Sequence, residues 1–262
     1  MKNYCVYILI LPVVTIINNL RTYFVARHYF PQFKPNGELP DAVRTDIKSK
    51  VSGLMINKLT GVSRNAFDSI FVSMFLGLYE TAVYNNYYYI MNAISSIMVL
   101  IIASLDAGVG NKVHTADVDE NYNDMNCMNF IYMWISGVCT VCLVCLYQPF
   151  MRIWMGENML LPFSAVALLC VYFYILCMGN IRSAYVQGTG IWWEQRYRAI
   201  AEAILNVVLN YILGKHFGVH GIILATVLSL FFINFCYGSS IPALFDNIMK
   251  KAILFIEWLF YF

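Results

Sequence analysis

The stretch RNAFDSIFVSMFLGL (residues 64–78) is apolar enough to be buried in lipid, yet it carries Arg64 and Asp68 four residues apart. It lies in a chain of 262 residues that is 60% hydrophobic and only 12% charged. An ordinary soluble domain has about a quarter charged residues. The composition therefore predicts a membrane protein. Neither end of the chain has a strongly acidic or basic tail, so we expect no nucleic-acid partner.

Seven hydrophobic runs approach the length of about 20 residues that a membrane-spanning helix needs. They are residues 4–20, 59–79, 87–109, 128–148, 160–181, 200–217 and 221–238. An eighth run, 252–262, is too short to span and contains Glu257. The first run lacks the small-residue cleavage site of a signal peptide, and Pro12 within it is expected to kink the helix rather than end it. The fold class is therefore all-α, a polytopic helical membrane protein of about seven transmembrane helices.

The basic residues are distributed unevenly between the two faces that the loops of such a protein occupy. Of the 17 Lys and Arg residues, twelve fall on one face and three on the other, and Arg64 and Arg182 lie within spans. Cytoplasmic loops carry the excess of Lys and Arg. The sequence therefore predicts an N-terminus outside the cell and a cytoplasmic C-terminus.

Four segments follow from this topology. Residues 1–24 form a first transmembrane helix, and residues 25–58 form a basic cytoplasmic linker whose apolar residues at helical spacing predict an amphipathic helix on the membrane surface. Residues 59–238 form a lobe of six transmembrane helices. Residues 239–262 form a cytoplasmic tail with a truncated final helix.

The sequence offers no enzyme site and no cofactor site. The predicted outer loops, residues 80–86, 149–159 and 214–220, are too short to hold a catalytic site for external sugars. Cys139, Cys142 and Cys145 have the spacing that begins an iron–sulfur motif, but the fourth ligand is absent. The four histidines show no ligand spacing, and there is no phosphate-binding loop. We predict no metal, no cofactor and no enzymatic activity.

Polar residues form stripes on the second and third spans. A charge at mid-bilayer costs at least about 2.5–3.5 kcal/mol, so charged side chains there usually face a protein interior or a wet cavity. Arg64 and Asp68 share one helical face and are close enough in sequence to pair. On the next span a polar stripe includes Asn85, Tyr89, Asn92 and Asp106. The stripes predict a hydrated cavity between the two helices.

Each of these residues also has an interpretation without a binding role. Arg64 and Arg182 can extend to the inner membrane surface, and Asp68 can be a structural partner for a packed helix. Snorkelling is favoured for Arg182, and a cavity-lining role is favoured for Arg64 and Asp68. The tyrosines around Tyr89 are typical of an interfacial aromatic belt, with a stacking platform for sugar rings as the alternative.

Several stretches together resemble the C-terminal half of bacterial polysaccharide repeat-unit flippases (Wzx-like proteins of the MOP exporter superfamily). In family order they are YFPQFKPNGELP (29–40), RNAFDSIFVSMFLGLYETAVYNNYYYI (64–90), ASLDAGVGN (103–111), CLYQPFMRIWMGE (145–157) and WWEQRYRAIAEAILNVVLNYILGKHFGVHGIILAT (192–226). The resemblance implies the second six-helix lobe of a MATE-like transporter, preceded by one helix.

The resemblance also implies a function and a site. The function is to move undecaprenyl-diphosphate-linked oligosaccharides across the bacterial cell membrane for capsule or surface polysaccharide, with that lipid-linked substrate and membrane lipids as partners. Position in the matched stretches favours Arg64, Asp68, Asn85, Asn86 and Asp106 as cavity residues, with Arg182 a weaker candidate. Our hypothesis is that Arg64 holds the diphosphate and that Asp68 tunes or releases it.

The first lobe of such a transporter has no counterpart in the sequence. The resemblance leaves open a truncated gene product, a fragment, or a half that pairs with a second copy. Two other classes also remain open. One is half of a cation-coupled multidrug exporter in which Asp68 is the coupling carboxylate. The other is a membrane partner that organises a glycan-assembly complex without transporting.

Overall fold

The computed structural model describes residues 4–32 and 38–237, and the regular elements in these ranges are all helical. Within them, five stretches are long and apolar enough to cross a membrane: Leu9–Tyr29, Leu78–Thr115, Asp119–Met155, Phe163–Thr189 and Arg196–Ile233. The prediction of an all-α, multi-pass membrane protein is confirmed. The predicted tail, 239–262, lies outside the described residues.

The chain divides into two units between Thr45 and Asp46. The first contains α1 (Tyr4–Tyr29) and the start of α2 (Asp41–Leu76). Helix α1 continues past Pro12, and its apolar side chains between residues 9 and 29 are exposed, as expected of side chains that contact lipid. Helix α2 joins the predicted amphipathic segment and the second predicted span into one continuous helix.

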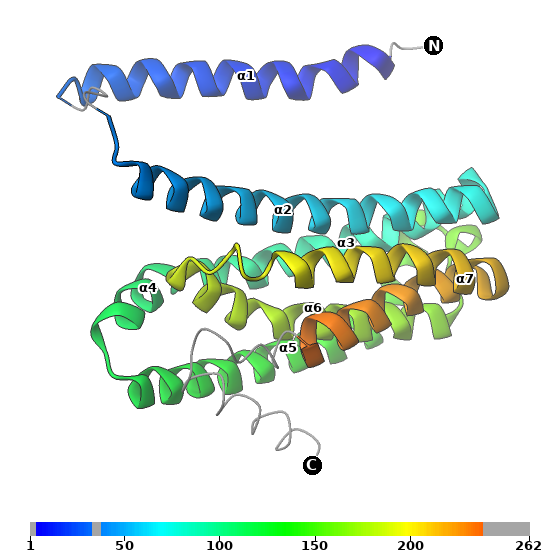
Figure 1. The fold of residues 1–262 in the computed structure, drawn as a ribbon. Helices are drawn as coiled ribbons and strands as arrows, with labels where there is room; N and C mark the ends of the chain where they lie inside the picture. Colours follow the sequence, from blue (N-terminus) through cyan, green and yellow to red (C-terminus); the bar gives the residue numbers. More distant parts are fainter. Residues whose placement is uncertain (1–3, 33–37, 238–262) are drawn as a thin grey trace. The chain divides into compact units, whose positions relative to one another are not determined.

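The second unit is a bundle built around one central helix. It contains the rest of α2, then α3 (Leu78–Ala103), α4 (Asp106–Thr115), α5 (Val118–Met155), the 3-10 turn η1 (Glu157–Met159), α6 (Phe163–Thr189), α7 (Arg196–Ser229) and the π-helical η2 (Leu230–Tyr237). Helix α6 contacts α3, α4, α5 and α7 (Figure 1). Helix α6 also contributes residues to the polar pocket of this unit.

Helix α7 contains a chain reversal, so it comprises two of the predicted spans. At Gly218 the backbone has φ 60° and ψ −135°, a combination that glycine adopts most readily. The segment after Gly218 runs back alongside the segment before it (Figure 1). We call the segments before and after Gly218 the two arms of α7. They approach so closely that a Cβ on Gly221 would lie 2.0 Å from the carbonyl oxygen of Leu213.

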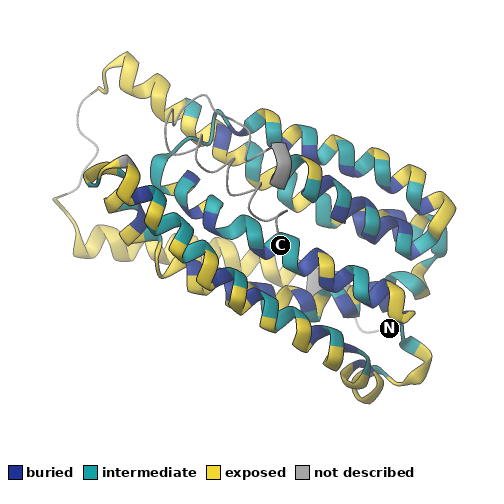
Figure 2. Cartoon of the chain, turned by 90° about the horizontal axis from the view of Figure 1, so that it is seen from below, coloured by how far each residue is buried: buried dark blue, intermediate teal, exposed yellow. Residues whose placement is uncertain are grey.

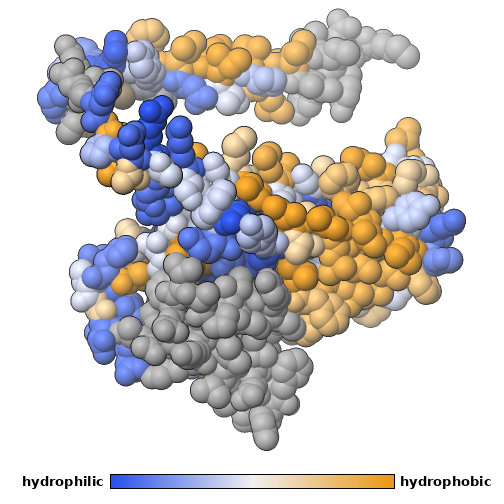
Figure 3. Space-filling model, viewed as in Figure 1, coloured by the Kyte–Doolittle hydropathy of each residue, from blue (hydrophilic) through white to orange (hydrophobic). Residues whose placement is uncertain are grey.

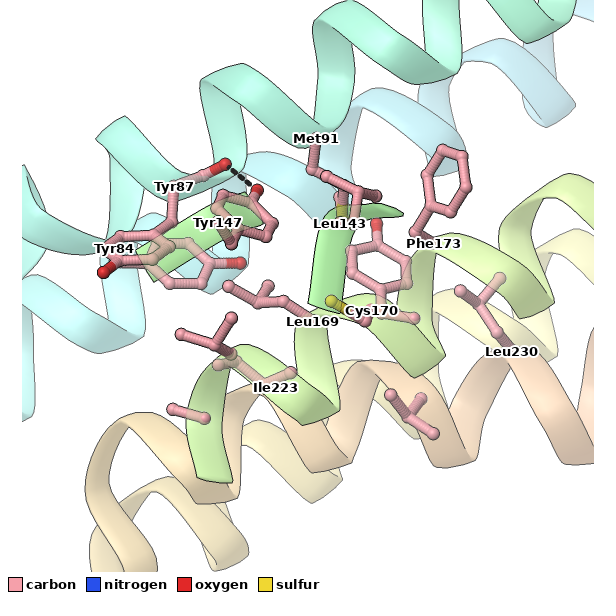
Figure 4. Packing of buried hydrophobic residues seen from close by; sticks show 14 of the residues in the cluster. Tyr84, Tyr87, Met91, Leu143, Tyr147, Leu169, Cys170, Phe173, Ile223 and Leu230 are labelled. Carbon is pink, nitrogen blue, oxygen red and sulfur yellow. Dashed lines mark hydrogen bonds between the residues drawn. The ribbon is translucent and has the colours of Figure 1, made fainter. Parts of the chain in front are cut away.

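The core of the second unit lies between α3, α5, α6 and α7. Figure 2 shows the buried residues on the inner sides of the helices and exposed residues on the outer sides. Tyr147 on α5 donates its hydroxyl to the carbonyl oxygen of Tyr87 on α3, 2.5 Å away (Figure 4). Tyr87 in turn donates to Gln148, 3.0 Å away. These hydrogen bonds join α3 to α5, in addition to the packing of the two tyrosine rings.

The outer surface of this bundle suits a lipid environment. On the face seen in Figure 3, hydrophobic side chains cover much of the bundle, and hydrophilic side chains gather at the end where α4 lies, with a smaller group at the opposite end. Large apolar residues such as Val141 and Ile153 are 63% and 88% exposed. In water a patch of this kind would drive association, whereas in a bilayer it meets acyl chains.

The turn between α4 and α5 is held by one buried asparagine. Asn121, 2% exposed, directs its side-chain nitrogen to the carbonyl oxygens of Lys112, Ala116 and Asp117 at 3.1–3.2 Å. The oxygens of Lys112 and Asp117 also accept backbone hydrogen bonds, from Ala116 and Asn121, so the Asn121 side chain adds a link from the end of α4 to the start of α5.

We expect Asn121→Ala to lower the free energy of unfolding by about 1–3 kcal/mol, because the side-chain hydrogen bonds that link three carbonyl oxygens across the turn are lost. The midpoint of thermal unfolding of the purified protein in detergent measures the change. Asn111→Ala is the matched control, since Asn111 is exposed on the same short helix α4. Equal midpoints for the two variants would show that the asparagine does not hold this turn.

Candidate functional site

A polar pocket of about 400 Å³ lies within the second unit. Residues of α2, α3, α4, α6 and α7 line it, together with Trp192 from the turn that precedes α7. Its charged residues are Lys58, Arg64, Asp106, Arg198 and Glu202, and its amide and hydroxyl residues are Asn57, Thr60, Asn180, Ser183 and Gln187. The pocket has the size of a small-molecule site but is far more polar than most.

Two arginines in the pocket share one carboxylate. Arg64 Nη1 lies 2.5 Å from Glu202 Oε1, and Arg198 Nη1 lies 3.3 Å from Glu202 Oε2. The three side chains are only 11–14% exposed. Charges so far from solvent need partners, because transfer out of water is expensive for each ion. Glu202 thus ties α2 to α7.

The turn before α7 sets the position of Arg198. Arg198 Nε donates to Gln195 Oε1 at 2.7 Å, and Nη2 reaches Asn57 Oδ1 at 3.4 Å. Asn57 also donates to the carbonyl oxygen of Trp192, 3.3 Å away. The backbones meet closely here, because a Cβ on Gly53 would lie 2.4 Å from the Trp193 nitrogen. The small residue lets α2 lie directly against this turn.

Asp68 lies outside the pocket, in a second polar cluster between α2 and the two arms of α7. It is 1% exposed, and its carboxylate accepts hydrogen bonds from Asn210 Nδ2 at 2.7 Å and Thr226 Oγ1 at 2.9 Å. Asn206 bridges these two donors, at 3.1 Å from Asn210 and 3.0 Å from Thr226. The carboxylate is therefore held by neutral groups.

The predicted pairing of Arg64 with Asp68 is not what the structure shows. One helical turn separates the two residues, but Arg64 bonds to Glu202 and Asp68 bonds to Asn210 and Thr226. Spacing of i and i+4 allows a pair on one helix, but here partners on α7 take both groups. The predicted stripe on α2 therefore supplies two separate clusters.

The other predicted site residues are dispersed. Asp106 lines the pocket, where it accepts a hydrogen bond from Gln187 at 3.0 Å. Arg182 on α6 interacts electrostatically with Arg198 and Glu202 beside the pocket. Asn85 is exposed and accepts a hydrogen bond from Ser69 at 2.9 Å, which joins the two predicted stripes at one point.

Three predicted residues lie on α3 away from the pocket. Asn86 is half-buried, Asn92 is exposed, and Tyr89 is 67% exposed with its ring near that of Trp154. The neighbouring Tyr84 and Tyr87 are 2% and 0% exposed and belong to the core, a placement that neither a belt nor a sugar platform predicts. The roles proposed for Asn86, Tyr89 and Asn92 stay predictions.

Helix α7 has a polar face that is not among the predicted stripes. Glu202, Asn206 and Asn210 step by four residues through an apolar span, as Arg64 and Asp68 do in α2. Arg198 continues the same row, one turn before Glu202. The same periodicity argument applied to residues 198–210 would have found these residues. It could not have shown which side chain meets which.

Comparison with known proteins identifies the fold. Neither the protein-family models nor the curated proteins contain a match to the sequence. Among solved structures, a multidrug resistance MATE family transporter of the MOP superfamily, in an outward-facing conformation, aligns with a TM-score of 0.65 and 18% identity. A MOP superfamily transporter from Pyrococcus furiosus aligns with a TM-score of 0.59 and 19% identity.

Each alignment covers 80% of this chain and 50% of the solved transporter. The chain thus spans half the length of the transporters that it matches. At these identities the likeness is one of fold.

Proposed function

We propose that this chain, which has the fold of half a MOP superfamily transporter, is part of a flippase for lipid-linked oligosaccharides in the bacterial cell membrane. The substrate would be an undecaprenyl-diphosphate-linked repeat unit for capsule or surface polysaccharide. The observation that carries the proposal is the convergence of Arg64 and Arg198, from two helices, on the carboxylate of Glu202 within one pocket. Such a surplus of guanidinium groups suits a diphosphate.

The rest of the pocket supports the same substrate class. Amide and hydroxyl groups from α2 and α6 face the pocket beside Trp192, and sugars are recognised through hydrogen bonds to hydroxyl groups and stacking on aromatic faces. The basic pocket residues Lys58 and Arg198 belong to the face that the positive-inside pattern places in the cytoplasm. A substrate loaded from the inner leaflet would meet these groups first.

The second half of the transporter would come from another segment or chain, or from a second copy of this one. In this topology the N-terminus lies outside the cell and the C-terminus in the cytoplasm. Because pockets on one fold differ in chemistry, the charge of this pocket, rather than the fold, favours an anionic lipid-linked substrate.

Arg64→Gln tests the proposal in a two-lobed transporter that contains this chain, expressed in cells without their own flippase. We expect export of surface polysaccharide to fall at least about tenfold, because the loss of one charge-assisted contact to a phosphate is worth about 1.5–3 kcal/mol. Lipid-linked oligosaccharide should accumulate in the inner leaflet. Both are measured by extraction and by surface labelling.

Arg152→Gln is the matched control, because Arg152 makes an exposed ion pair with Glu157 and lies outside the pocket. Normal export by the Arg64 variant would contradict the proposal. It would instead favour a membrane partner that organises glycan assembly without transporting.

A cation-coupled exporter is the second candidate, and the surroundings of Asp68 favour it. This buried carboxylate is hydrogen-bonded to neutral groups, so protonation or a bound monovalent cation could neutralise it without displacing an arginine. Asp68→Asn would then abolish the dependence of transport on the ion gradient. If deletion impairs drug export and leaves surface polysaccharide intact, the exporter is the correct function.

A further inference from the structure

Glu202 occupies the place in the pocket where an anionic ligand would bind. Its two carboxylate oxygens contact guanidinium groups from two different helices, Arg64 on α2 and Arg198 on α7. A phosphate group also accepts charge-assisted hydrogen bonds from guanidinium groups through its oxygens. Glu202 and a ligand phosphate therefore cannot hold the same arginine donors together.

The two arginines have donors and positions that suit such an exchange. Arg64 Nε is buried and has no hydrogen-bond partner among the described residues. All three side chains line one pocket that is large enough for a small ligand. Arg198 is held in place by Gln195 and Asn57 independently of Glu202, so it would keep its position when Glu202 leaves.

A displaced Glu202 has another cation within electrostatic range. Arg182 on α6 attracts Glu202 electrostatically, whereas Arg198 repels Arg182. When the Glu202 carboxylate leaves Arg64 and Arg198, it therefore still has a positive charge nearby. This lowers the cost of its displacement, since an unpaired buried carboxylate would be strongly disfavoured.

We propose that Glu202 is an internal competitor for the anionic ligand, which must displace it from Arg64 and Arg198 in order to bind. The inference rests on the proposed function, because it takes the arginine pair to be the phosphate site. Glu202 keeps the arginines paired while the site is empty. It also selects for ligands whose phosphate charge exceeds that of a single carboxylate.

The test is the affinity of the purified chain, in lipid nanodiscs, for inorganic diphosphate, measured by isothermal titration calorimetry. Glu202→Gln should bind the probe about tenfold more tightly than the wild type, because no ion pair has to be broken first. Glu202→Asp keeps the charge but is too short to bridge both arginines. It should bind several-fold more tightly than the wild type.

Two controls separate direct competition from a general change of charge. Asp106→Asn also removes a negative charge from the pocket lining, but the hydrogen bond recorded for Asp106 is to Gln187 rather than to an arginine. It should raise the affinity much less than Glu202→Gln does. Glu194→Gln makes the same chemical change at a residue outside the pocket lining and should leave the affinity unchanged.

The outcomes distinguish this inference from the proposed function. If the wild type binds diphosphate, Arg64→Gln abolishes binding and Glu202→Asp matches the wild type, Glu202 is not a competitor and the anion site stands. Equal gains for Asp106→Asn and Glu202→Gln would overturn the inference in the same way. If no variant binds diphosphate, both the inference and the proposed anion site are wrong. Should Glu202→Gln fail to fold, Glu202→Asp decides the question alone.

Discussion

Replacing Asp68 with alanine should strongly destabilise the second unit. The carboxylate accepts hydrogen bonds from Asn210 and Thr226, and those two donors are fully buried. Each buried donor that loses an acceptor costs about 1–3 kcal/mol; Thr226 loses the acceptor of its hydroxyl, and Asn210 loses one of its two. The midpoint of thermal unfolding in detergent should fall well below that of the wild type.

Asp68→Asn provides the matched control for the shape of the side chain. The amide keeps an oxygen for one donor, and its nitrogen can donate to the hydroxyl oxygen of Thr226. It also removes the cost of burying a carboxylate, so its stability should equal or exceed that of the wild type. If the alanine variant is as stable as the asparagine variant, the hydrogen bonds of Asp68 do not hold α2 against α7.

The second large effect is expected at the reversal of α7. Gly221→Ala places a methyl group 2.0 Å from the carbonyl oxygen of Leu213, a contact that only a movement of backbone can relieve. Overpacking that forces the backbone to shift typically costs about 1–3 kcal/mol, and occasionally more. The two arms of α7 should separate, and Thr226 on the second arm should lose its place beside Asp68.

Gly137→Ala on α5 is the control, because a Cβ there meets no atom within 4 Å. Thermal unfolding of both variants measures the stability, and a disulfide between cysteines introduced at neighbouring positions of the two arms would report their separation. A Gly221 variant as stable as the Gly137 variant would contradict the close approach of the arms.

Variants in the two polar clusters of α2 should differ in the property that changes first. Changes at Asp68 and Gly221 act on the buried contact between α2 and α7 and should appear first as a loss of stability. Changes at Arg64 and Glu202 act on the pocket and should appear as changes in anion affinity and export. A variant that loses export at unchanged stability therefore points to the pocket.

The sequence by itself determined that the chain crosses a membrane as a set of helices, because a bilayer requires apolar runs of a minimum length and their spacing can be counted. It also determined that α2 has a polar face, because a period near 3.6 residues places Arg64 and Asp68 on one side. Both are local properties of the chain.

Only the tertiary structure decided which groups meet. Arg64 pairs with Glu202, which is 138 residues away in the sequence, and Asp68 bonds to Asn210, 142 residues away. Such pairings depend on the rotation and depth of each helix and on the reversal at Gly218, which no local period specifies. The exposure of Asn92 and Tyr89 was decided in the same way, because α3 turns those residues outward and packs Tyr84 and Tyr87 into the core.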